Sequence, residues 1–144
     1  MSIHSSQTRL VTGDQGFVGS LCLQTWPQAV GLSALAGASI DICDKAALKR
    51  ALSGTSFTEV IHLAGISFVP EAVADPLRAY QVNFLGTLNL LECLRDIGFS
   101  GRFIYVSSGD AYGLVPTDHF PVQEVTPLMP RNPYAVNKAA AEAL

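Results

Sequence analysis

The feature that most constrains the fold of this chain is the alternation of short apolar runs with residues that typically begin helices. Five runs are predicted as strands, at residues 9–12, 29–32, 38–41, 59–64 and 102–107. Helices are predicted from residue 17, over 45–52 behind an Asp cap, over 75–97 from an Asp-Pro pair, and over 132–144 from an Asn-Pro pair. This alternation predicts an α/β fold in which a doubly wound parallel sheet is covered on both faces.

Length and composition are those of one domain over residues 1–144, since 49% of the 144 residues are hydrophobic and 15% charged. Residues 113–133 hold five prolines and are expected to form a surface connection. The helix that begins at Pro133 has no later strand to return to, so its apolar face and the neighbouring sheet edge should lack part of their cover. We therefore expect a C-terminally truncated sheet.

Charge and hydropathy exclude several classes of partner. A net charge of -3 and a pI near 5.5, without any cluster of Lys and Arg, argue against nucleic acid. Residues 1–10 contain no signal-peptide core and no apolar stretch reaches membrane-spanning length, so a cytoplasmic protein without a membrane partner is expected. Cys22, Cys43 and Cys93 lack Cys-x-x-Cys spacing and are predicted to be reduced thiols. No metal site is expected.

Three glycines stand between the first predicted strand and the helix that follows it. Gly13, Gly16 and Gly19 form Gly-x-x-Gly-x-x-Gly, and their missing side chains would let backbone N–H groups approach a phosphate at the helix N-terminus. The spacing differs from Gly-x-Gly-x-x-Gly, but the strand-turn-helix context favours the pyrophosphate of a dinucleotide.

The second predicted strand leaves the form of the dinucleotide open. An acid about 20 residues after the glycine turn usually binds the ribose hydroxyls, yet this strand ends at Leu32-Ser33 without one. The missing carboxylate leaves NADP possible, and no nearby Arg favours it over NAD. Asp41 is a candidate for the adenine edge, or equally a turn acid.

Tyr134 and Lys138 lie four residues apart on the last predicted helix, so their side chains share one face. General acid–base catalysis needs a proton donor poised near the working pH, and a neighbouring ammonium stabilises the ionised form of a phenol. Ser108 lies at the polar end of the preceding strand, where parallel sheets place their sites, and its hydroxyl could hydrogen-bond a reacting oxygen. These three residues are candidate catalytic groups.

Taken together, segments 12–19, 41–44, 62–65, 107–113 and 134–138 resemble the extended short-chain dehydrogenase/reductase family, of the NAD-dependent epimerase/dehydratase type. The resemblance implies a Rossmann-like fold, with Tyr134 as acid/base, Lys138 holding the nicotinamide ribose and Ser108 orienting the reacting oxygen. Asp110 joins them as a candidate catalytic residue or a turn residue. The candidate cofactor-binding set is Gly13, Gln15, Gly16, Phe17, Val18, Gly19, Asp41, Ile42, Leu63, Ala64, Gly65, Asn83, Ser107, Tyr134 and Lys138; for Asn83 a structural role is the preferred interpretation.

Within that family, segments 68–72, 83–91, 98–101 and 130–134 look like those of GDP-6-deoxy-mannose reductases. The implied reaction is reduction of the 4-keto group of a GDP-linked 4-dehydro-6-deoxy sugar to GDP-rhamnose. Gly109 and Asp110 replace the acidic pair of the dehydratases and disfavour elimination of water. The alternatives are a nucleotide-sugar 4-epimerase, a 4,6-dehydratase, or an inactive nucleotide-binding fragment whose substrate half is largely absent. The resemblance also implies a homodimer formed through the helices over 80–94 and 133–144.

Overall fold

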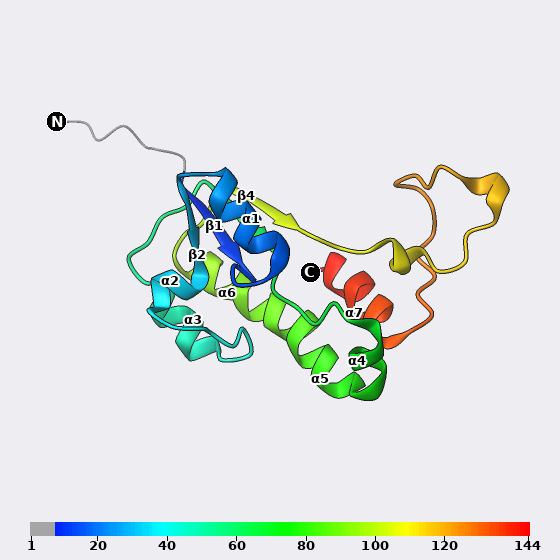
Figure 1. The fold of residues 1–144 in the computed structure, drawn as a ribbon, viewed down its shortest axis with the longest axis horizontal. Coiled ribbons are helices and arrows are strands. Elements are labelled where there is room, and N and C mark those ends of the chain that lie inside the picture. The colour runs from blue at the N-terminus through cyan, green and yellow to red at the C-terminus, as the bar shows by residue number, and fades with distance from the viewer. Residues whose placement is uncertain (1–7) are drawn as a thin grey trace.

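The computed structural model describes residues 8–144, which fold around one parallel sheet (Figure 1). Its four strands are β1 (Arg9–Thr12), β2 (Ala29–Gly31), β3 (Glu59–His62) and β4 (Arg102–Tyr105). They lie in the order β2-β1-β3-β4, and all neighbours are parallel. The predicted α/β class and parallel sheet are confirmed.

The strand predicted at 38–41 is wrong. Helix α2 (Leu32–Ala36) begins directly after β2 and ends at Gly37, whose φ of 69° is left-handed. Irregular chain then leads to helix α3 (Lys45–Leu52), so no strand forms beyond β2. The run 29–32 was also predicted too long, because Leu32 already belongs to α2.

The predicted helix starts and caps are confirmed. Asp44 accepts a hydrogen bond from Ala47 N at the start of α3, and Asn132 accepts one from Ala135 N at the start of α7 (Pro133–Glu142). Asp75 caps the long helix in the same way. That helix is continuous and consists of α5 (Pro76–Tyr80), a π-helical segment η1 (Gln81–Gly86) and α6 (Thr87–Asp96).

The remaining elements are short, apart from α1 (Phe17–Thr25). Helix α4 (Val69–Ala74), which the sequence did not predict, lies between β3 and α5 and contacts α7. The Pro-rich connection 113–133 lacks strands and carries one 3-10 turn, η3 (Thr117–His119); another, η2 (Gly109–Tyr112), precedes it. The predicted surface connection is confirmed.

One face of the sheet carries the main hydrophobic core. In register across the sheet, Leu10, Val60 and Phe103 face the same side. The buried side chains of α3 and α6 cover them, including Leu48 and Leu90, each with no exposed surface. Burial of this apolar surface is the main contribution to the stability of the fold.

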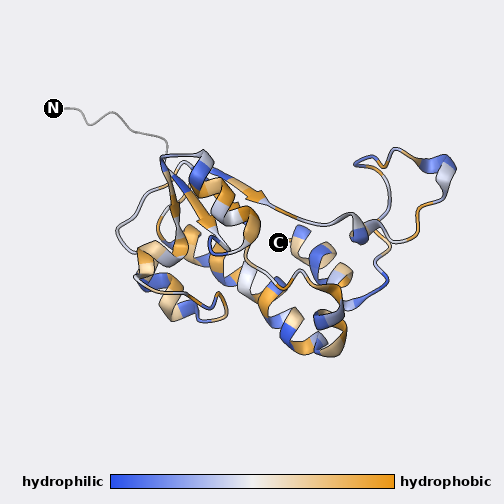
Figure 2. Ribbon diagram, in the orientation of Figure 1, coloured by the Kyte–Doolittle hydropathy of each residue, from blue (hydrophilic) through white to orange (hydrophobic). Residues whose placement is uncertain are grey.

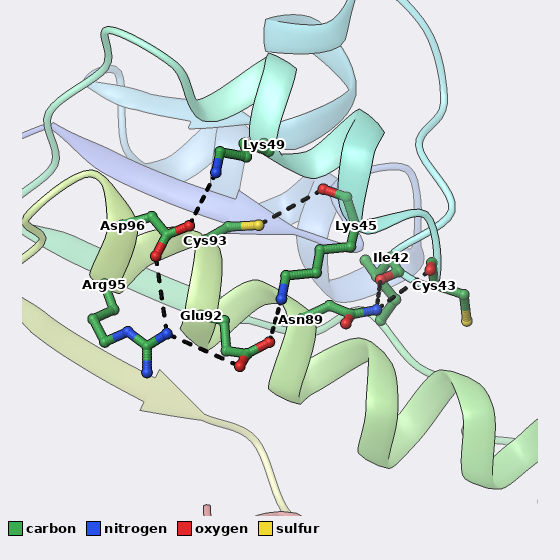
Figure 3. Close-up of polar contacts among 9 residues, drawn as sticks. All are labelled: Ile42, Cys43, Lys45, Lys49, Asn89, Glu92, Cys93, Arg95 and Asp96. Atoms are coloured by element: carbon green, nitrogen blue, oxygen red, sulfur yellow. Dashed lines mark hydrogen bonds and ion pairs between the residues drawn. The ribbon is translucent and has the colours of Figure 1, made fainter.

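Ion pairs and hydrogen bonds join α3 to α6 along the rim of this core (Figure 3). Lys45 lies 2.5 Å from the Glu92 carboxylate, and Lys49 lies 3.3 Å from that of Asp96. The Asn89 amide donates to the backbone carbonyls of Ile42 and Cys43 at 3.2 and 3.3 Å. These bonds to Asn89 fix the chain at Ile42, where it enters the edge of the candidate site.

The other face is covered less completely. Val11, Ile61 and Ile104 are in register on this side, and their exposure rises from 0% to 7% to 36% from β1 to β4. Helix α1 lies over β1, and Figure 2 shows hydrophobic residues along both. The expectation of a sheet covered on both faces is wrong at β4, whose residues are exposed or half-buried, so the expected lack of cover is found at this sheet edge. It is not found on the apolar face of α7, where Ala135 and Ala141 are buried.

Within residues 8–144, no helix is long and apolar enough to cross a membrane. The three cysteines are free thiols, and Cys93 is buried. The expectation about a signal peptide in residues 1–10 rests largely on residues 1–7, which lie outside the described residues.

Candidate functional site

The turn after β1 requires glycine at two positions. Gly13 has a φ of 66°, and a Cβ there would lie 2.7 Å from the backbone nitrogen of Ala64. A Cβ on Gly19 would overlap the carbonyl oxygen of Gly13. The chain therefore uses glycine both for the left-handed turn and for the close packing of α1 on it.

A buried hydrogen-bonded network supports this turn from below. The Thr12 hydroxyl lies 2.6 Å from His62 Nδ1, and the other ring nitrogen lies 2.9 Å from the Thr87 hydroxyl. Thr12 Oγ1 also accepts hydrogen bonds from the backbone N–H groups of Leu63 and Ala64. Burial, with a smaller contribution from the Lys138 charge, lowers the pKa of His62 to about 4, so its ring is neutral at pH 7. His62 is therefore a hydrogen-bonded core residue that supports the turn.

A hollow opens beside the end of β2, and we call it the β2-side hollow. Its lining residues are Gly13, Asp14, Gln15, Gly16, Leu32, Ser33, Ser39, Ile40, Ile42 and Ala64. The structure thus brings five residues of the candidate cofactor-binding set, namely Gly13, Gln15, Gly16, Ile42 and Ala64, together with side chains that the sequence analysis did not select. The most important of these is Asp14, which is buried and whose carboxylate accepts hydrogen bonds from Ser33.

A second hollow, which we call the α7-side hollow, begins at the same glycine turn. It is lined by Gly13, Gly16, Phe17, Val18, Gly19, Leu63, Ala64, Gly65, Ser67, Val106, Ser107, Tyr134 and Lys138. The two hollows share Gly13, Gly16 and Ala64. Together they form one groove across the carboxyl ends of β1 and β3, where parallel sheets bind their ligands.

Two candidate cofactor residues lie outside both hollows. Asp41 is exposed; the backbone N–H of Cys43 and then the Arg78 guanidinium at 3.1 Å lower its pKa. Asn83 is buried and exchanges two hydrogen bonds with the backbone of Ile66, at 2.8 and 3.0 Å. Asn83 therefore holds the chain after β3, which is the structural role expected for it.

Helix α7 carries Tyr134 and Lys138 on one buried face that borders the α7-side hollow. Lys138 Nζ donates to the Val106 carbonyl at 2.8 Å and lies 4.8 Å from the ring centre of Tyr105 and 6.0 Å from that of Tyr134. Burial lowers the pKa of Lys138. Spacing on a helix thus brings the two side chains together, as predicted, and Val106 fixes the ammonium beside the phenol ring.

The polar residues after β4 divide into two groups. Ser107 lines the α7-side hollow, and its hydroxyl donates to Glu142 of α7. Ser108 accepts a hydrogen bond from Asp110 N at 3.2 Å and so caps the 3-10 turn η2, while Asp110 is exposed. Ser108 and Asp110 are not among the residues that line either hollow.

These features define the chemistry that the groove can support. A glycine turn at a helix N-terminus suits phosphate, and a phenol beside a buried ammonium suits proton transfer. In the described range 8–144, no group of three or more His, Cys, Asp and Glu side chains is placed to hold a metal ion. The lining residues that the sequence did not indicate are Asp14, Leu32, Ser33, Ser39 and Ile40 at one end of the groove and Ser67 and Val106 at the other.

Comparison with known proteins gives consistent matches. Residues 32–144 match the family model described as GDP-mannose 4,6 dehydratase. GDP-6-deoxy-D-mannose reductase of Pseudomonas aeruginosa is 59% identical over 59% of this chain and 28% of that protein. The structure of the P. aeruginosa protein RMD complexed with NADPH superimposes with a TM-score of 0.86 at 43% identity, over 96% of this chain and 47% of that one.

Epimerases are also similar to this chain. The Thermus thermophilus UDP-glucose 4-epimerase complexed with NAD superimposes with a TM-score of 0.79 at 33% identity, over 95% of this chain and 49% of that one. The chain therefore spans about half the length of these solved relatives, or less in the curated reductase match.

Proposed function

Since the chain belongs to the GDP-mannose 4,6 dehydratase family, we propose that it supplies the dinucleotide-binding half and the acid–base group of a nucleotide-sugar reductase. The observation that carries this proposal is the single groove, which runs from the end of β2 past the glycine turn to Tyr134 and Lys138. Phosphate-binding backbone and a proton donor thus border the same surface.

The residues present fit a nicotinamide dinucleotide. The glycine turn packs closely on the chain after β3 and on the start of α1, since a Cβ at Gly13 or Gly19 would meet neighbouring backbone. It therefore lies at the N-terminus of α1, where backbone N–H groups suit a pyrophosphate. The P. aeruginosa relative binds NADPH and the T. thermophilus relative binds NAD, which supports a cofactor of this class in one of its two forms. The bound nicotinamide would supply the hydride for the reduction.

The side chains of α7 have separate roles in this proposal. Tyr134 delivers the proton to the reacting sugar oxygen, and Lys138 holds the nicotinamide ribose while its charge stabilises the phenolate that remains. Val106 keeps the Lys138 ammonium at the groove by accepting its hydrogen bond. Ser108, at the cap of η2, orients the substrate oxygen, and Asp110 borders the substrate.

The substrate class follows from the reductase relative and from the turn after β4. We propose a GDP-linked 4-dehydro-6-deoxy sugar, whose reduction gives the GDP-6-deoxy sugar. Gly109 and Asp110 favour this reaction over dehydration because elimination needs both a base and an acid near the hexose, and Gly109 offers neither. The similar epimerases keep UDP-sugar epimerisation as the second candidate.

Two parallel assays separate these functions. In the first, purified protein is mixed with NADH or NADPH and GDP-4-dehydro-6-deoxy-mannose, and absorbance of the reduced nicotinamide is followed. Stoichiometric loss of absorbance with formation of the 6-deoxy sugar supports the reductase. In the second, the protein is mixed with NAD⁺ and UDP-glucose, and formation of UDP-galactose without net change in the nicotinamide would instead establish an epimerase. Binding of dinucleotide with neither reaction would reduce the proposal to a nucleotide-binding module.

The proposal includes a homodimer formed through the long helix and α7. Helices α5 and η1 contact α7, and apolar side chains on these elements are exposed, among them Leu77, Leu85 and Val136. Pairing this surface with a second copy would bury those side chains. Sedimentation equilibrium tests the dimer, and Leu85→Lys should shift a dimer toward monomer if this surface forms the interface.

A further inference from the structure

We propose that the groove selects NAD(H) over NADP(H), and that Asp14 is the residue that determines this choice. The inference rests on the proposed binding of a nicotinamide dinucleotide and adds to it the form of the cofactor. The orientation of the dinucleotide, the position of a carboxylate and the charges around it carry the argument.

The orientation follows from the groove itself. Tyr134 and Lys138 line the α7-side hollow, so the reacting nicotinamide must lie there. The glycine turn is shared by both hollows and takes the pyrophosphate. The adenosine end therefore falls in the β2-side hollow, and its ribose faces the end of β2.

The carboxylate expected at the end of β2 comes from another segment. Ser33 stands 20 residues after Gly13, which is where dinucleotide-binding folds commonly place the acid that binds the ribose hydroxyls. Here Asp14 reaches the same place from the glycine turn. Its carboxylate accepts hydrogen bonds from the Ser33 hydroxyl and from Ser33 N, the latter at 3.3 Å.

The backbone of β2 makes room for this arrangement. A Cβ on Gly31 would overlap the Asp14 carboxylate, so the acid occupies the space that a side chain of β2 would otherwise fill. Asp14 is 8% exposed and lines the β2-side hollow. Its position is therefore fixed by Ser33 on one side and by Gly31 on the other.

The charges at this end oppose a 2′-phosphate. Among the described residues that line the β2-side hollow, Asp14 is the charged one, and no Lys or Arg accompanies it. Arg50 lines a separate depression between α2 and α3 that shares only Ser39 and Ile40 with the hollow. A 2′-phosphate would bring a second negative charge to a buried carboxylate without a cation, whereas a ribose hydroxyl can donate to it.

The test is direct binding, which does not depend on turnover. Dissociation constants for NADH and NADPH are measured by nicotinamide fluorescence, and those for 5′-ADP and 2′,5′-ADP by calorimetry. We expect NADH to bind at least roughly tenfold more tightly than NADPH. Asp14→Asn, which keeps the shape and removes the charge, should reduce this ratio by roughly tenfold. Asp44→Asn is the matched control, because Asn also caps a helix and residue 44 does not line the hollow.

The outcomes separate this inference from the proposed function. NADPH binding as tightly as NADH to the unaltered protein would overturn the inference and leave a nicotinamide-dependent function standing. A ratio equally large in Asp14→Asn would overturn the role of Asp14. A clear preference for NADH in a protein that reduces no sugar would support the inference while the proposed reaction fails. The preference for NADH over NADPH is measured first on the unaltered protein, so this part of the test does not require any variant to fold.

Discussion

The two hollows of the groove are built from different kinds of sequence information. In the α7-side hollow, Tyr134 and Lys138 lie on one helix, and local spacing alone places them on one face. In the β2-side hollow, Asp14 and Ser33 come from two segments 19 residues apart and meet only because β1 and β2 are neighbours in the sheet. Two catalytic residues on the same helix can be predicted from their spacing in the sequence. Two residues brought together by neighbouring strands can be paired only when the fold is known.

The largest expected effect separates catalysis from binding at the α7-side hollow. Tyr134→Phe removes the proton donor, so reduction of the keto sugar should slow by about 10² to 10⁴-fold. NADH affinity should change little, because the phosphates and adenosine bind elsewhere in the groove. Steady-state rates and NADH titration check both values. Tyr80→Phe on α5, a partly exposed tyrosine outside the groove, is the control, and equal losses in both variants would contradict the role of Tyr134.

The next largest effect should come from Gly13, because this residue lines both hollows. Gly13→Ala imposes a left-handed backbone on Ala, which costs about 1–3 kcal/mol, and also places a Cβ 2.7 Å from Ala64 N. Affinity for NADH and for NADPH should fall together, leaving their ratio unchanged. Chemical denaturation and fluorescence titration give the two values.

Gly37→Ala provides a matched control for that substitution. Gly37 has a φ of 69°, close to that of Gly13, but a Cβ there would have no neighbour within 4 Å. Its loss of stability should therefore reflect backbone strain alone, with cofactor affinity retained. If Gly37→Ala weakened cofactor binding as much as Gly13→Ala, the close contact between Gly13 and Ala64 would not be the reason that the groove needs glycine at position 13.

A smaller effect concerns the network beneath the shared part of the groove. His62 has a pKa of about 4 in the folded protein and near 6.5 when unfolded, so the unfolded chain binds more protons between these values. Stability is therefore lost as the pH falls from 6.5 toward 4, by about 2 kcal/mol between pH 7 and pH 5. Urea unfolding at the two pH values measures it.

His62→Gln should flatten this pH dependence, since an amide does not titrate in that range. His119→Gln, in the exposed turn η3, should leave the dependence as in the unaltered protein. An unchanged slope in His62→Gln would show that other groups cause the loss of stability in acid.

Much of the fold could be predicted because its signals are local. The caps at Asp44, Asp75 and Asn132 marked three helix starts correctly, and periodic apolar residues marked four of the five proposed strands. The strand at 38–41 failed because only Ile40 of this run packs against the core, and it does so from irregular chain without a strand partner, while residues 38, 39 and 41 are exposed. One apolar side chain on the core does not show that a segment is hydrogen-bonded in a sheet.

The candidate site shows the same division. The glycine turn and the Tyr134–Lys138 pair were selected from the sequence, and both line the groove. An acid was sought at the end of β2 and was not found there, because Asp14 stands beside Gly13 in the sequence and reaches the end of β2 only through the fold. Gly31 was the available signal, since a strand residue without a side chain often marks the close approach of another group.

The smallest expected effect tests how Asp14 is held in the β2-side hollow. Ser33→Ala removes the hydroxyl that donates to the Asp14 carboxylate but keeps the backbone N–H that donates to the same group. The carboxylate then stays near the ribose in a less fixed position. The preference for NADH over NADPH should therefore fall by about threefold, which is less than in Asp14→Asn, because the charge of Asp14 and its hydrogen bond from the Ser33 backbone both remain. Ser39→Ala, in the same hollow, is the control.

The comparison of these two serines decides whether Asp14 acts as a positioned group or only as a nearby charge. If Ser33→Ala left the ratio of dissociation constants unchanged, the charge of Asp14 alone would select NADH, without the hydrogen bond from the Ser33 hydroxyl. The contact between Asp14 and β2 would then matter less for cofactor selection than the geometry indicates. If Ser33→Ala reduced the ratio as much as Asp14→Asn, the hydroxyl itself would be the group that contacts the ribose. If the carboxylate is held between Ser33 and Gly31, Ser33→Ala should reduce the ratio of dissociation constants only in part, and Ser39→Ala should leave that ratio unchanged.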